Sequence, residues 1–209
     1  SGAALLQIGS LLANDSDDWR LYAAQQTLGA GGIDGAQRII DQISSDSPFA
    51  PDAEIVRASI QIERGNDEAA AAAAERALTI AGDRWSIIAS VGDVYRRIGH
   101  PDRAIPAFDR ALTLTQDAKD RADVLGWRAY AHRFAGNVSA ATADMRAAYQ
   151  ADQSFDTRLL YVTILMDDPA AWSDGIQMAR SLFAEQPDSV MRLNALGYAL
   201  IQRPEGLEE

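Results

Sequence analysis

Apolar residues recur along the chain at intervals of three and four positions, which place them on one face of a helix. We expect six such helices near residues 17–30, 51–64, 85–98, 122–135, 156–168 and 190–202, with bounds that follow from the 34-residue register of the turns described below. Each of the first five is followed, after a short turn, by a second helical segment. The pattern therefore predicts an all-α protein that is built from helical hairpins.

The turns within these hairpins resemble one another. Each carries a glycine that is followed five residues later by a small residue, and the pairs are Gly31 and Ala36, Gly65 and Ala70, Gly99 and Ala104, and Gly136 and Ala141. The glycines are therefore 34, 34 and 37 residues apart. A period near 34 residues is typical of an array of helix–turn–helix repeats.

The first of these turns lies in a glycine-rich stretch, LGAGGIDGA at residues 28–36, which also has the look of a phosphate-binding loop. A dinucleotide-binding loop follows a strand, whereas the preceding DDWRLYAAQQT has helical spacing. A phosphate loop also ends in Gly-Lys-Ser or Gly-Lys-Thr, and this stretch does not. We therefore interpret residues 28–36 as a turn between two helices and predict no nucleotide cofactor.

Residues 85–118 form the most complete repeat, with Val91-Gly92, Tyr95, Gly99, Ala104, Phe108 and Ala111. This pattern resembles the tetratricopeptide repeat (TPR). Counted from this unit, the repeats fall at 17–50, 51–84, 85–118, 122–155 and 156–189, with a partial repeat at 190–209. Only Lys119 to Arg121 interrupt the 34-residue frame.

The resemblance implies an all-α fold, a right-handed α-solenoid of stacked helix–turn–helix (TPR) hairpins that forms one array over residues 1–209. Residues 3–16 are expected to be a helix of a truncated or capping repeat. The sequence is expected to be a fragment of a bacterial TPR-containing protein, and the use of arginine at all basic positions except Lys119 agrees with a GC-rich bacterial genome.

Small residues are expected where the two helices of each hairpin cross, because they allow close approach. The eighth and twentieth positions of the repeats carry them, at Ala24, Ala58, Gly92, Ala129, Thr163 and Gly197 and at Ala36, Ala70, Ala104, Ala141 and Gly175. Gly92 is expected to cross at Ala104.

The chain of 209 residues has 19 basic and 30 acidic residues and a net charge of −11. This charge repels nucleic acid and anionic membranes, so neither is an expected partner. No apolar run approaches the ~20 residues that span a bilayer, and direct membrane insertion is not expected. The absence of cysteine leaves the compartment open; the bacterial envelope or periplasm is favoured, with the cytoplasm as an alternative.

The sequence carries no recognisable catalytic constellation. His132 occupies a packing position, the eleventh of its repeat, and His100 lies in a turn. Acidic pairs such as Asp167-Asp168 fall at helix ends, where carboxylates interact with the helix dipole or face water. We therefore predict a protein that is not an enzyme and has no catalytic residue, cofactor or metal site.

The resemblance implies a protein-interaction scaffold that binds a peptide or a partner protein in its concave groove. The family lines that groove with positions two, five, nine and twelve of each first helix. The corresponding candidate residues are Gln25, Ser59, Ile62, Asp93, Arg96, Tyr130, Arg133, Ile164, Asn194 and Tyr198. Arg96, Tyr130 and Arg133 are the most suggestive, since guanidinium and aromatic groups favour carboxylates and aromatic anchors. Two alternatives stay open, namely that these residues form an ordinary solvated inner face, and that a partner binds on the convex face instead.

A second hypothesis is an accessory or adaptor region of a larger bacterial enzyme or envelope machine, such as polysaccharide export, a protease adaptor or a glycosyltransferase. A third is self-association through the C-terminal end. For residues 190–202 we expect packing on the fifth repeat through Leu193, and exposure of Leu196, Gly197 and Leu200.

Overall fold

The computed structural model describes residues 16–201, which form helices and turns without a strand. The α-helices in chain order are α2 (Asp17–Gly29), α3 (Ile33–Ile40), α4 (Ala50–Glu63), α5 (Asp67–Ile80), α6 (Trp85–Arg97), α7 (Pro101–Leu114), α8 (Ala118–Phe134), α9 (Val138–Ala151), α10 (Phe155–Leu165), α11 (Trp172–Glu185) and α12 (Val190–Ile201). The prediction of an all-helical chain is confirmed.

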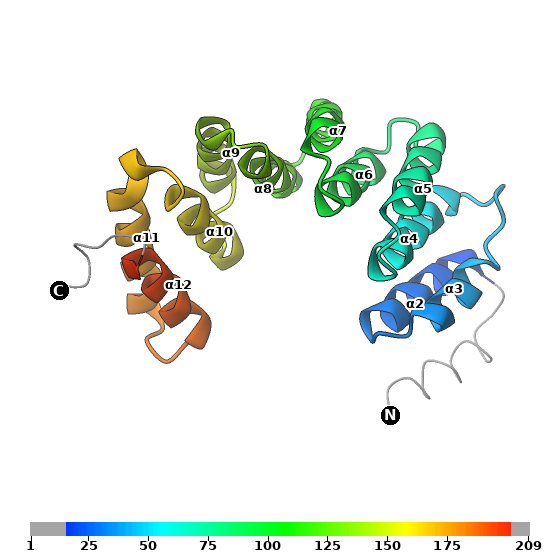
Figure 1. The fold of residues 1–209 in the computed structure, drawn as a ribbon, viewed down its shortest axis with the longest axis horizontal. Coiled ribbons are helices and arrows are strands. Elements are labelled where there is room, and N and C mark those ends of the chain that lie inside the picture. The colour runs from blue at the N-terminus through cyan, green and yellow to red at the C-terminus, as the bar shows by residue number, and fades with distance from the viewer. Residues whose placement is uncertain (1–15, 202–209) are drawn as a thin grey trace. The chain divides into compact units, whose positions relative to one another are not determined.

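The helices follow one another as hairpins of a first and a second helix (Figure 1). The first helices α2, α4, α6, α10 and α12 match the ranges that the 34-residue register predicts to within three residues at each end, and α8 begins four residues before its predicted range. Within the hairpins, α2 packs on α3, α4 on α5, α8 on α9 and α10 on α11. The sequence period thus corresponds to one hairpin.

The chain divides into two compact units, unit 1 over residues 1–111 and unit 2 over residues 112–209, and α7 carries the boundary. In unit 1, α4 contacts both α2 and α6. In unit 2, α10 contacts both α8 and α12. Each unit therefore contains a row of three first helices, which defines one face of that unit. The assignment of all 209 residues to one array stays a prediction.

The repeated glycines end the first helices as expected. Gly31 has a φ of 80° and Gly99 a φ of 77°, in the left-handed region that glycine adopts without strain. The N–H of the residue after Gly99 donates to the carbonyl of Tyr95 at 2.8 Å, and Gly32 donates to Thr27 at 2.9 Å. These bonds satisfy helix-terminal carbonyls in a Schellman motif. The stretch at residues 28–36 therefore holds the end of α2, a turn at residues 30–32 and the start of α3.

The fifth hairpin closes its turn without such a glycine. A short 3-10 helix, η1 (Pro169–Ala171), follows Asp168, whose side chain accepts from the N–H of Ala170 at 3.0 Å. The indole Nε1 of Trp172 donates to the carbonyl of Met166 at 2.9 Å. A side-chain cap and an indole thus replace the glycine turn of the other hairpins.

Alanines fill the predicted crossings, and Ala24, Ala36 and Ala58 are completely buried. At Gly92 the neighbour differs from the expected Ala104: an added Cβ would meet the ring of Phe108 at 2.7 Å. Gly197 is also different, because nothing lies within 4 Å of an added Cβ there. The crossing rule therefore holds for the buried hairpins and not for α12.

The three residues that interrupt the repeat frame, Lys119 to Arg121, lengthen α8 at its start. Asp117 caps this helix by accepting from the backbone N–H groups of Lys119 at 2.8 Å and of Asp120 at 3.1 Å. The insertion is therefore absorbed as one further helical turn, and the turn glycine Gly136 keeps its place in the hairpin.

The expected orientation of the last helix is wrong. Leu193 is 52% exposed, whereas Leu196 and Leu200 are partly buried against a core cluster that includes Val162 and Leu182. Ala199 belongs to that cluster, and Ala195, one turn earlier, is also buried, so these small residues allow α12 to approach α10 and α11 closely. The expected helix within residues 3–16 lies outside the described residues, except for Ser16.

Candidate partner-binding surface

The first helices of unit 2 bring together several of the predicted groove residues. Tyr130 and Arg133 lie on α8, Asp167 follows the end of α10, and Tyr198 lies on α12. Tyr130 and Tyr198 lie close enough to the guanidinium of Arg133 that their phenols, when ionised, raise its pKa. We name this cluster of Tyr130, Arg133, Asp167 and Tyr198 the tyrosine–arginine cluster.

Arg133 and Asp167 occupy the same position, the twelfth, in neighbouring repeats. The Nε of Arg133 donates to Oδ2 of Asp167, and its Nη2 donates to Oδ1 at 3.2 Å. The hydrogen bond to Asp167 raises the pKa of Arg133. Both side chains retain part of their surface, at 35% and 25% exposure, so a ligand has access to a fixed guanidinium.

The contribution of α12 is one half-buried aromatic residue and one exposed amide. Tyr198 is partly buried and packs against the core cluster of α10 and α11. Asn194 lies one helical turn earlier and is exposed. Residues four apart share a helix face, so both belong to the same side of α12.

In unit 1 the predicted residues are more dispersed. Asp93 accepts from Nε of Arg96 at 2.9 Å and from Nη2 at 2.6 Å on α6. Ser59 and Ile62 are partly buried on α4, and Gln25 is exposed on α2. The Asp93–Arg96 pair, three residues apart on one helix, presents neutralised charge to the first-helix face.

One predicted groove residue has no access to a partner. Ile164 is completely buried, together with Leu165 and Val162. The segment LLYVTILM at 159–166 is apolar around most of its circumference, and a helix of this kind becomes buried on several sides. Ile164 is therefore a core residue and is removed from the candidate site.

Sequence reasoning missed two aromatic residues on α8. Trp127 is 37% exposed and Phe134 is 67% exposed. They are seven residues apart, and Tyr130 falls between them, so the three lie within about 60° of one side of the helix at 100° per residue. The signal was the aromatic spacing of three and four residues, which repeat-position counting ignores.

The acidic residues singled out in the sequence have structural roles. Asp167 pairs with Arg133, and Asp168 caps a helix turn. Residues 16–201 hold no group of three or more histidine, cysteine, aspartate or glutamate side chains that is placed to bind a metal ion. Across the same residues, no helix has both the length and the apolar character needed to cross a membrane.

Comparison with known proteins identifies the repeat. Two family models, each described as Tetratricopeptide repeat, match residues 23–84 and 87–122. No curated protein matches the sequence significantly.

Solved structures share the fold at low sequence identity. A thermophilic TPR protein of Thermus thermophilus, TTC0263, is 14% identical, with a TM-score of 0.69 over 89% of this chain and 100% of that one. A TPR protein from Parabacteroides merdae ATCC 43184 is 13% identical, with a TM-score of 0.68 over 88% of this chain and 72% of that one. YrrB, described as a TPR protein with an unusual peptide-binding site, is 15% identical, with a TM-score of 0.58 over 92% of this chain and 98% of that one.

The hairpin period, the positive-φ glycine turns, the two matched segments and these structures agree on one repeat class. That repeat supports a protein-interaction scaffold in general, and its fold is typically non-catalytic. The chain belongs to the tetratricopeptide-repeat family.

Proposed function

We propose that this protein is a non-enzymatic scaffold that binds a peptide segment of a partner protein on the first-helix face of unit 2. The observation that carries the proposal is the tyrosine–arginine cluster. Arg133 is held in place by Asp167 and lies near Tyr130 and Tyr198. Tyrosine and arginine are enriched among the few residues that contribute most of the binding energy of a protein interface.

The chemistry of the cluster favours a peptide that carries an aromatic or carboxylate group. Tyrosine provides a large contact area at a low entropic cost, and arginine binds carboxylates through a planar fork of donors. The exposed ring of Phe134 extends the apolar area along α8. The net charge of −11 argues that the remainder of the partner surface is neutral or basic.

Selection of random displayed peptides against the whole chain tests this proposal. We expect peptides that bind the native chain and lose at least about tenfold in affinity when Tyr130 and Arg133 are both replaced by alanine, because interface anchors cost at least about 1–2 kcal/mol each. Arg146→Ala is the matched control, since Arg146 is an exposed arginine on the second helix α9 of the same unit. Equal loss in the control, or selected peptides that are indifferent to the double substitution, would refute the assigned surface.

A further inference from the structure

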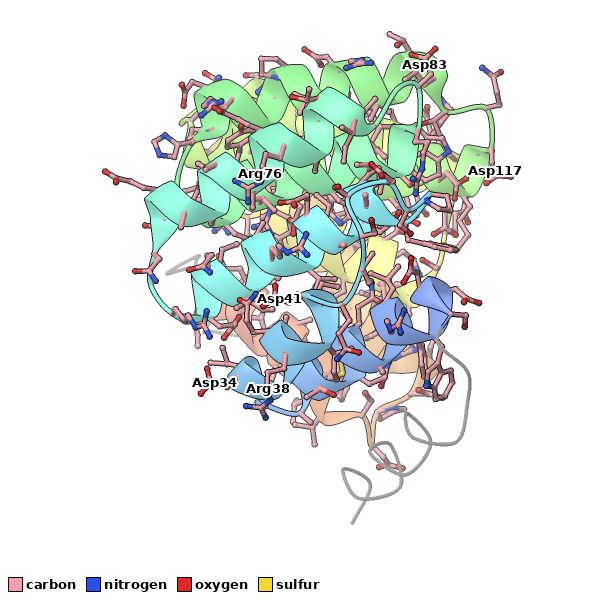
Figure 2. The ribbon with its side chains drawn as sticks, turned by 90° about the vertical axis from the view of Figure 1, so that its right-hand side faces the viewer. Asp34, Arg38, Asp41, Arg76, Asp83 and Asp117 are labelled. Carbon is pink, nitrogen blue, oxygen red and sulfur yellow. The ribbon has the colours of Figure 1, made fainter. Side chains whose placement is uncertain are left out.

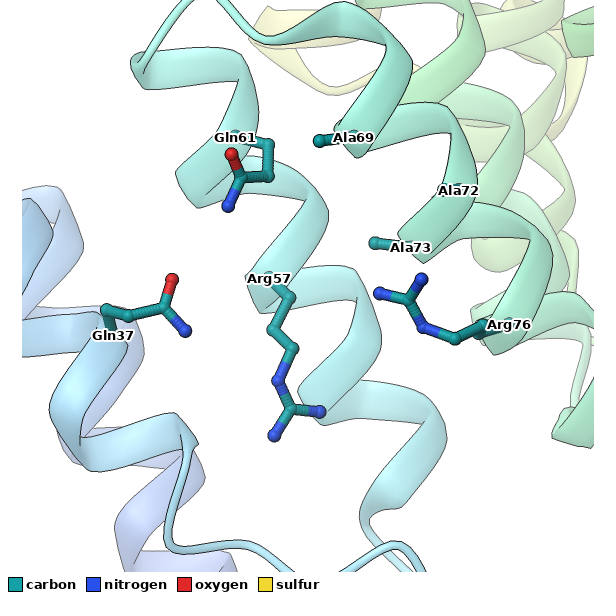
Figure 3. Close-up of a pocket in the computed structure, with 7 residues that line it drawn as sticks. All are labelled: Gln37, Arg57, Gln61, Ala69, Ala72, Ala73 and Arg76. Atoms are coloured by element: carbon teal, nitrogen blue, oxygen red, sulfur yellow. The ribbon is translucent and has the colours of Figure 1, made fainter.

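Unit 1 contains a pocket of about 190 Å³ between three helices. Its lining includes Gln37 from α3, Arg57 and Gln61 from α4, and Ala72, Ala73 and Arg76 from α5 (Figure 3). A second hollow of about 350 Å³ also has Arg57 and Arg76 in its wall. The walls of this second hollow are partly apolar, with Ile43, Ala50 and Ile80.

This pocket lies on the side of unit 1 that carries the second helices. Arg57 and Gln61 are one helical turn apart on α4, whereas Ser59 of the first-helix face is two positions from each and therefore about 200° away. Figure 2 views that side and shows Asp41 at the end of α3 and Arg76 on α5. The pocket is thus distinct from the first-helix row and belongs to unit 1 alone.

Two arginines of the pocket share one internal carboxylate. Arg57 Nη1 donates to Oε1 of Glu54 at 2.8 Å, and Arg76 Nε donates to Oε2 at 2.9 Å. Arg57 Nη2 also donates to the carbonyl of Ile40 at 2.9 Å, and its Nε lies 3.7 Å from Asp41. These contacts fix the orientation of both guanidinium groups.

The internal partners do not use all the donors. A guanidinium has five N–H groups, and the hydrogen bonds of Arg57 engage two of them, to Glu54 and Ile40. Arg76 is 56% exposed and directs its guanidinium across the pocket toward α4 (Figure 3). N–H groups on both sides of the pocket therefore remain for an acceptor from outside.

The fourth repeat shows what such an acceptor looks like. Arg128 has the repeat position of Arg57, and it binds Asp144 with Nε at 2.8 Å from Oδ2 and Nη2 at 2.6 Å from Oδ1. Asp144 has the repeat position of Ala73. In the second repeat, alanine thus replaces the carboxylate, and the space in front of Arg57 is open.

The third repeat shows how the same place is closed. There Val91 and Tyr95 have the positions of Arg57 and Gln61, and Arg103 has that of Ala69. The guanidinium of Arg103 lies 4.2 Å from the centroid of the Tyr95 ring and covers it. The open pocket is therefore a property of the second repeat, with its arginine, glutamine and alanines.

We propose that this pocket of unit 1 binds a carboxylate side chain of an acidic peptide, with an adjacent aliphatic side chain of the peptide in the hollow beside Ile43 and Ile80. Glu54 and Asp41 balance the charges of Arg57 and Arg76, so the selection of a carboxylate rests on the oriented N–H groups that these two partners leave unused. The planar fork of arginine matches a carboxylate. This site lies outside the tyrosine–arginine cluster and is independent of it.

Chemical-shift titration of the ¹⁵N-labelled whole chain tests the inference with three probes. These are the peptide acetyl-Leu-Glu-Glu-amide, its counterpart acetyl-Leu-Gln-Gln-amide, and inorganic phosphate at equal concentrations. We expect the acidic peptide to shift the side-chain amide of Gln61 and the backbone amides of Ala72 and Ala73. Equal shifts with the glutamine peptide, or with phosphate, would overturn the proposal of an acidic peptide.

Two variants separate binding from folding. Arg76→Ala should lower the affinity for the acidic peptide about tenfold, as expected for the loss of one charge-assisted hydrogen bond. Ala72→Leu fills the pocket from an exposed position of α5, and should abolish the shifts without lowering the melting temperature. Arg97→Ala, which removes an arginine paired with Glu63 elsewhere in unit 1, is the control and should change nothing. Unchanged affinity in both pocket variants, or shifts at Ser59 and Ile62 instead, would refute the site.

Discussion

The ring of Phe108 occupies the space where a side chain at Gly92 would stand. A Cβ at Gly92 would lie 2.7 Å from Cε1 of Phe108, and Phe108 is completely buried. Glycine at the eighth position of this repeat therefore permits a large aromatic residue to pack against the first helix α6. Gly92 and Phe108, which belong to the repeat pattern of residues 85–118, therefore pack as a complementary pair.

Gly92→Leu should consequently destabilise unit 1. Overpacking of a filled core costs about 1–3 kcal/mol, to be measured as the loss in unfolding free energy in urea. The matched control is Gly197→Leu, at the same repeat position of α12, where an added Cβ meets nothing within 4 Å. An equal loss in both variants would contradict the packing argument, because both substitutions change helix propensity alike.

Asp144→Ala should destabilise the hairpin of α8 and α9. The side chain of Asp144 is only 10% exposed and that of Arg128 22%, so removal of the carboxylate leaves a largely buried cation without its closest partner. We expect a loss of about 2–4 kcal/mol in unfolding free energy, slightly below the range for fully buried pairs. Glu63→Ala breaks the exposed pair with Arg97 and should cost less than about 1 kcal/mol. Similar losses in the two variants would show that burial is not the cause.

The stability of unit 2 should fall in acid through Glu185. Hydrogen bonds from Arg158 and Arg192 lower the pKa of this carboxylate to about 2. The pKa of this carboxyl in the unfolded chain is about 4.3, so its contribution to stability is complete above that pH and is lost as pH falls toward 2. Urea unfolding of the native chain should show a steeper decline over this window than Glu185→Gln. Parallel pH profiles would exclude the proposed contribution of Glu185.

Much of the fold follows from local sequence. The 34-residue spacing predicts the first helices, since each repeat carries its own turn glycine and its own small crossing residues. The exceptions arise where the packing of a side chain depends on the particular residues of a neighbouring helix, which the repeat pattern does not specify. The repeat pattern predicts that Leu193 packs on the fifth repeat, but α12 buries the small side chains of Ala195 and Ala199 and leaves Leu193 exposed.

The candidate site was less predictable than the fold. Repeat-position counting identified Tyr130, Arg133 and Tyr198 but could not reveal that Arg133 pairs with Asp167, because this contact joins two repeats. It also placed Ile164 on the surface, since the counting ignores how apolar the whole of α10 is. The pocket at Arg57 depends on an alanine at a position where another repeat has aspartate, and only the three-dimensional contacts give that difference a meaning.

The central claim, that a partner binds on the first-helix face of unit 2, is tested most directly by site-specific photo-crosslinking. Benzoylphenylalanine replaces Phe134 in one protein and Arg146 in another, and each is irradiated with the tightest displayed peptide. Phe134 is exposed beside the tyrosine–arginine cluster, whereas Arg146 is exposed on the second helix α9. The account predicts a crosslink from position 134 that excess unlabelled peptide suppresses, and none from position 146. A crosslink from position 146 alone would contradict it.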